Sequence, residues 1–152
     1  MLAVLSLVTV MANIQGVAAP FSSLFPMLVD SPPDGELAGT LEQVRQQLAD
    51  TPSSADRTSP ALDVMISDFG WYHVAMAVIA ATVAATLIGP TAALWTKFAR
   101  TTPSNKPTRR VLASFATLSA LSSLALIVDA VGNTTVASAP TPALAALFNG
   151  GW

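Results

Sequence analysis

The chain has 152 residues, of which 52% are hydrophobic and 11% are charged, and its mean hydropathy is +0.56. Soluble domains carry about 25% charged residues, so this composition excludes an ordinary soluble domain. The sequence contains no cysteine, which excludes disulfides, thiolate metal sites and cysteine nucleophiles, and its net charge of -2 does not suggest a nucleic-acid partner. The composition therefore predicts a small, all-α integral membrane protein.

The charged residues are sorted by segment, and this sorting predicts an orientation. Residues 30–68 hold eight of the nine acids together with Arg45 and Arg57, whereas residues 97–110 hold five bases and no acid. Short cytoplasmic loops of membrane proteins are enriched in Lys and Arg. The basic segment is therefore predicted to be cytoplasmic, with the N-terminus inside and both the acidic segment and the C-terminus outside. The expected location is the inner (plasma) membrane, crossed several times.

Three apolar segments are predicted to cross the membrane, because each is long enough to span a bilayer. Residues 1–29 contain no charged side chain. A retained anchor is favoured over a cleaved secretory signal there, since no Lys or Arg precedes the apolar run and Pro20 would follow the cut. Residues 71–96 form the second predicted span and residues 111–131 the third. The remaining segments are an outer loop (30–70), an inner loop (97–110) and an outer tail (132–152).

Short helices are predicted in the outer loop and in the tail. In the loop, an amphipathic helix over about residues 36–49 carries an apolar stripe at helical spacing, and a shorter helix over about 60–68 begins with Ser59 as its N-cap and Pro60 as its first residue. The tail repeats this pattern with Thr141 and Pro142, and glycines 150 and 151 supply the stop. The two predicted apolar faces consist of Leu37, Leu41, Val44 and Leu48 in the loop and Leu144, Leu147 and Phe148 in the tail.

An isolated helix of this length is marginal in water, so the striped helix needs a surface to lie on. Packing against the chain's own spans or the lipid interface is one alternative, and docking on a neighbouring subunit is the other. The seven stripe residues are accordingly candidate partner contacts. Small residues four apart, at Ala77, Ala81 and Ala85 and at Ser119 and Ser123, indicate close helix packing within the chain or with a partner.

Few side chains in the predicted spans can carry chemistry. His73 and Asp129 both lie two residues inside the outer end of a predicted span, so they are expected at similar depth and could form a polar pair. Ionisable groups within a membrane are candidates for a functional role, although two independent interfacial residues are the plainer alternative. We expect no catalytic, cofactor-binding or metal-binding residue in this chain, and no enzymatic activity.

The inner loop offers a candidate lipid contact. Its bases can hold the headgroups of anionic phospholipids, each contributing about 1 kcal/mol near the surface. A simple topology signal explains the same residues equally well. The five bases are Lys97, Arg100, Lys106, Arg109 and Arg110.

Three Ala-, Val- and Thr-rich spans with an acidic outer loop give the chain a recognisable plan, in which residues 68–73 (Asp-Phe-Gly-Trp-Tyr-His) are the most distinctive string. This plan resembles the small association factor of the actinobacterial respiratory supercomplex. The resemblance implies cytochrome bcc and cytochrome aa3 oxidase subunits as partners, with haem, copper and quinone chemistry in those partners. It implies no catalytic residue in this chain.

The sequence therefore predicts a non-catalytic accessory subunit of a larger bacterial inner-membrane complex. A small oligomeric transporter or channel component is the alternative. Such a component would need several copies, because three spans with one embedded acid cannot easily enclose a pathway.

Overall fold

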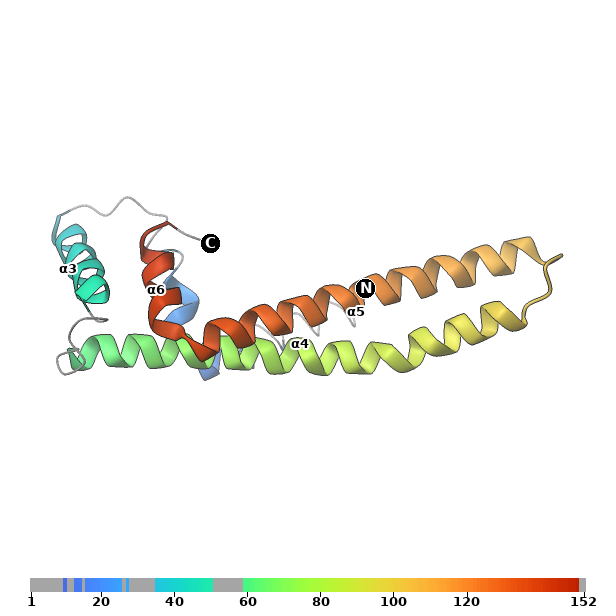
Figure 1. Ribbon diagram of the computed structural model, residues 1–152, viewed down its shortest axis with the longest axis horizontal. Helices are drawn as coiled ribbons and strands as arrows, with labels where there is room; N and C mark the ends of the chain where they lie inside the picture. Colours follow the sequence, from blue (N-terminus) through green and yellow to red (C-terminus); the bar gives the residue numbers. More distant parts are fainter. Residues whose placement is uncertain are drawn as a thin grey trace. The chain divides into compact units, whose positions relative to one another are not determined.

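The structure is a computed structural model that describes residues 10, 13–14, 16–25, 27, 35–50 and 59–150 (Figure 1). The described residues form helices and turns without a strand, which confirms the all-α class for this part of the chain. The named elements are the 3-10 helix η1 (Ser22–Leu24) and the α-helices α3 (Glu36–Asp50), α4 (Pro60–Arg100), α5 (Lys106–Ser138) and α6 (Pro140–Phe148).

The chain divides into two compact units. The first, which we call the cluster unit, comprises residues 1–75 and 133–152, and the second, the hairpin unit, comprises residues 76–132. Helices α4 and α5 each contribute residues to both units.

Helix α4 begins where the sequence predicts a start. The Ser59 hydroxyl accepts the backbone N–H of Leu62 at 3.3 Å, and Pro60 occupies the first helical position. The predicted short helix over 60–68 is nevertheless wrong as a separate element, because α4 continues without a break into the predicted second span. Nothing between residues 68 and 71 stops it, because no proline is present and the single glycine, Gly70, lies within the helix.

Helix α5 is longer than the predicted third span at both ends. Gly132 and Asn133 do not stop it, and it ends at Ser138 instead. Pro140 explains this end, since proline has no N–H to continue the helix and disfavours the helical conformation at the residue before it. Ala139 accordingly has φ -141° and ψ 66°.

Helix α6 starts at Pro140, so the predicted cap at Thr141 is wrong. Pro140 is itself suited to the first helical position, and its N-cap Ala139 makes no side-chain cap bond. The predicted glycine stop is confirmed at Gly150, which has φ +77° and donates its N–H to the carbonyl of Leu147 at 3.1 Å. A positive φ at this position is favourable for glycine alone among common residues.

Two helices among the described residues, α4 and α5, are long and apolar enough to cross a membrane. They contain the predicted second and third spans, whereas the predicted first span, residues 1–29, lies largely outside the described residues. Only 11% of the most apolar window of either helix is buried within the protein. This exposure is the reverse of what the core helix of a soluble domain shows.

In the hairpin unit, α4 and α5 run in opposite directions and are joined by a turn at residues 101–105 (Figure 1). The Thr91 and Ser119 hydroxyls hydrogen-bond across them at 2.6 Å. The buried side chains of this unit are all small, namely Ala80, Ala84, Ala116 and Ser123. Many of its large apolar side chains are exposed, namely Val78, Ile88, Trp95, Val111, Phe115, Leu118, Leu121, Leu124, Ile127, Val128 and Val131.

The predicted small-residue stripe of α4 is one position out of register with the buried face of the helix. Ala81 and Ala85 are exposed, whereas the neighbouring Ala80 and Ala84 are buried. On α5 the prediction fares better, because Ser123 is buried and Ser119 is half-buried. Alanine is so frequent in this span that spacing alone does not identify the buried face.

The cluster unit has an apolar core that joins four elements and Phe25. Helix α6 packs against α3, and Leu62 and Phe69 of α4 belong to the same cluster. Phe25 stacks on Phe69 with ring centroids 6.4 Å apart and lies 6.3 Å from the Phe148 ring. The buried members are Phe25, Leu41, Leu48, Leu62, Phe69, Leu144, Leu147 and Phe148, with Val44, Met65, Ile66 and Val136 partly buried beside them.

Because of this core, we expect two leucine-to-alanine substitutions to differ strongly in their effect on the free energy of unfolding. Leu144 is fully buried, so Leu144→Ala should lower the free energy of unfolding by about 2 to 5 kcal/mol. Leu37→Ala is the matched control, since Leu37 is 46% exposed on α3 and should change stability by less than about 1 kcal/mol. Denaturant unfolding of the purified chain in detergent, followed by tryptophan fluorescence, measures both. Equal losses from the two substitutions would contradict the assigned core.

Candidate functional site

The two predicted apolar faces cover each other. Leu41 and Leu48 of α3 and Leu144, Leu147 and Phe148 of α6 lie in one cluster, with Val44 half-buried at its edge. The striped helix therefore lies on the tail helix α6, a surface that neither alternative named, and docking on a neighbouring subunit stays a prediction. Leu37 differs from the other six candidate contacts because it stays exposed.

Arg45 fastens α3 to the end of α6. Its Nε donates to the Phe148 carbonyl at 2.8 Å, and its guanidinium lies 3.5 Å from the Glu42 carboxylate on the same helix. The last carbonyls of a helix have no partner within the helix, and an arginine side chain can satisfy them. The single base described in the acidic segment thus has a structural use that its position in the sequence did not indicate.

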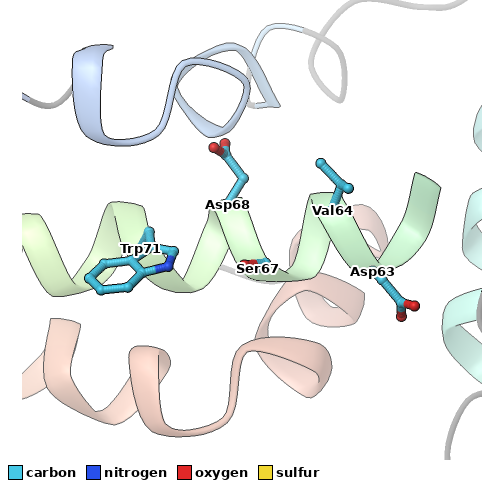
Figure 2. A pocket seen from close by; sticks show the side chains of 5 residues that line it. All are labelled: Asp63, Val64, Ser67, Asp68 and Trp71. Atoms are coloured by element: carbon cyan, nitrogen blue, oxygen red, sulfur yellow. The ribbon is translucent and has the colours of Figure 1, made fainter. Parts of the chain in front are cut away.

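Asp68 ties the N-terminal segment to α4. Its Oδ2 accepts the Ser22 backbone N–H at 2.8 Å and the Ser22 hydroxyl at 2.7 Å, and Ser22 is buried. Figure 2 shows Asp68 directed towards the N-terminal segment while Asp63 points away from it. These two acids, with Val64, Ser67 and Trp71, line an open depression of about 320 Å³ (Figure 2).

His73 makes its polar contact with Asn133 of α5. Its Nδ1 lies 2.8 Å from Asn133 Oδ1, and its ring packs edge-on against Phe69 at 4.6 Å between centroids. Because an amide oxygen only accepts, Nδ1 carries the proton in this hydrogen bond. Asn133 follows Asp129 by one helical turn, so the depth argument that suggested Asp129 applies equally to it. The pairing of His73 with Asp129, whose side chain is exposed, stays a prediction.

The basic residues flank the turn of the hairpin unit, and Arg109 differs from the rest. Its guanidinium donates to the carbonyls of Phe98 at 3.2 Å and Thr101 at 2.8 Å, and it lies 4.1 Å from the centre of the Phe98 ring. Arg109 therefore caps the end of α4 and holds the turn. The other four candidate headgroup contacts, Lys97, Arg100, Lys106 and Arg110, are exposed.

Among the described residues no group of three His, Asp or Glu side chains could hold a metal ion. The described contacts instead hold elements together, since Arg45, Asp68, His73 and Arg109 each link one element to another. Comparison with protein-family models, curated proteins and solved structures found no match to this chain.

We expect His73 and Asn133 to be energetically coupled. Replacing either residue by Ala removes a hydrogen bond whose net contribution is about 0.5 to 1.5 kcal/mol. A double-mutant cycle on unfolding should therefore return a coupling free energy in this range. A parallel cycle on His73 and Asp129 tests the pair predicted from the sequence, and additive effects in the Asn133 cycle would contradict the hydrogen bond.

Proposed function

We propose that this chain is a non-catalytic accessory subunit of a larger bacterial inner-membrane complex, which it stabilises through contacts of its helices and its outer segments. The observation that carries the proposal is the inverted packing of the hairpin unit. Small side chains are buried there, and large ones such as Phe115, Leu118 and Leu121 are exposed. Such a surface must be covered by lipid or by helices of other proteins, because burial of apolar area is the main favourable term in folding and association.

The proposed complex is a respiratory supercomplex containing cytochrome bcc and cytochrome aa3 oxidase. The overall plan of the chain supports this choice, through its resemblance to the association factor of that assembly. Haem and copper would reside in the partner subunits. In this proposal the acidic outer loop and the tail face the outside, where they are available to extracytoplasmic parts of the complex.

Co-purification from native membranes in mild detergent tests the proposal. We expect cytochrome bcc and oxidase subunits in stoichiometric amounts with the tagged chain. A photo-crosslinking residue at Leu121, which is 59% exposed, should give adducts with those subunits, whereas the same residue at the fully buried Ala116 is the matched control and should give none. Recovery of a monomer would overturn the proposal, and a homo-oligomer that moves a solute in liposomes would support the transporter or channel alternative.

The proposed orientation has its own test, since the natural chain has no cysteine. Gln46→Cys lies on the exposed face of α3, and Ser104→Cys lies in the turn at 101–105. A membrane-impermeant maleimide should label Gln46→Cys in intact spheroplasts and Ser104→Cys only after permeabilisation. The reverse pattern would place the basic turn outside and contradict the orientation.

A further inference from the structure

Four of the five bases at the hairpin turn have no charge partner within the described residues. Their side chains are exposed and make no hydrogen bond or ion pair with a described side chain. Residues 69–128 contain no Asp or Glu, so no acid close to them in the sequence can neutralise them. Arg109 is different, because its charge is used to cap α4.

The bases at the start of α5 occupy positions that destabilise the helix when no anion is bound. Lys106, Arg109 and Arg110 all lie at the N-terminal end of the helix, which has no acid in its first turn. The helix dipole is positive at this end, so cations there cost about 0.3 to 1 kcal/mol each. Lys106 and Arg110 are also four residues apart, a spacing at which like charges repel. An anion supplied from outside the chain would relieve both effects.

Exposed apolar side chains adjoin these bases. Trp95 is 42% exposed just before Lys97, and Val111 and Phe115 are 55% and 60% exposed just after Arg110. A soluble anion would neutralise the bases and leave this apolar surface in water. A ligand that presents an anionic group and an apolar body together satisfies both parts of the surface.

We propose that the four free bases form a binding site for the headgroups of anionic phospholipids. The phosphate oxygens accept hydrogen bonds from the lysine and arginine side chains, while the acyl chains lie against the apolar residues of the adjoining turns. The members are Lys97 and Arg100 on α4 and Lys106 and Arg110 on α5. This site requires only that the hairpin unit is in a membrane, and it is independent of any partner subunit.

Fluorescence quenching of Trp95 tests the proposal directly. The full-length chain with Trp71→Phe and Trp152→Phe keeps Trp95 as its one tryptophan, and it is reconstituted in phosphatidylcholine vesicles containing a minor share of brominated lipid. Brominated phosphatidylglycerol should quench Trp95 more than brominated phosphatidylcholine at the same mole fraction. The preference should fall about fivefold for each base changed to Gln, the equivalent of about 1 kcal/mol per base, and should weaken with added salt.

Three controls separate the outcomes. Trp71, kept as the one tryptophan through Trp95→Phe and Trp152→Phe, lies next to acids and should show no preference. Lys106→Arg should retain the preference that Lys106→Gln reduces, and circular dichroism should show unchanged helicity in both. Equal quenching of Trp95 by the two lipids in the unsubstituted turn would overturn the proposal. So would loss of the preference on adding inorganic phosphate at constant ionic strength, because that result indicates a soluble-anion site.

Discussion

The contact between α6 and α3 is the interaction on which the cluster unit depends. Neither helix is stable alone in water at its length, and each supplies the apolar surface that the other lacks. Fully burying a leucine or phenylalanine contributes about 1.5 to 3 kcal/mol, so the meeting of Leu41 and Leu48 with Leu144 and Phe148 accounts for much of this unit's stability. The contact joins segments about a hundred residues apart in the chain. The capping bond from Arg45 to the Phe148 carbonyl then fixes how α3 lies on α6.

The two units satisfy their apolar side chains in opposite ways. In the cluster unit the buried core consists of leucine and phenylalanine side chains, as in a soluble domain. In the hairpin unit the buried side chains are small, and many of the large apolar ones are exposed. Small residues let two helices approach closely where lipid gives no hydrophobic advantage to burying large ones. The threonines exposed on α4 fit the same setting, because Thr82 and Thr96 donate their hydroxyls to carbonyls one turn earlier in their own helix and so leave no unpaired donor.

Much of the helical content could be predicted from the sequence, and the limits of the prediction have physical causes. The cap at Ser59 and the stop at Gly150 depend on local properties of single residues: a side-chain oxygen that accepts a backbone N–H, and a glycine that adopts a positive φ. Such properties can be read from a sequence. Spacing reveals an apolar face and not what covers it, so the sequence leaves the mutual burial of the two apolar stripes open. The register of the buried alanines is unreadable for a related reason: where nearly every residue is apolar, no periodicity distinguishes a buried face. Asn133 has the sequence pattern of a helix breaker, although its distance from the turn matches that of His73.

The charges sorted along the sequence have at least three uses. Arg45 and Arg109 cap helix ends, where each side chain donates to carbonyls that have no partner within the helix. Asp68 accepts hydrogen bonds from the backbone N–H and the hydroxyl of Ser22. A positive-inside signal needs only that bases be present, so it does not distinguish Arg109 from Arg110. The structure distinguishes them, because the Arg109 guanidinium hydrogen-bonds to carbonyls at the turn and the Arg110 side chain is exposed. Lys106 and Arg110 are exposed at the N-terminal end of α5, where cations are unfavourable, and Lys97 lies close to the exposed Trp95. An external anion with an apolar body would stabilise both the charges and the apolar surface.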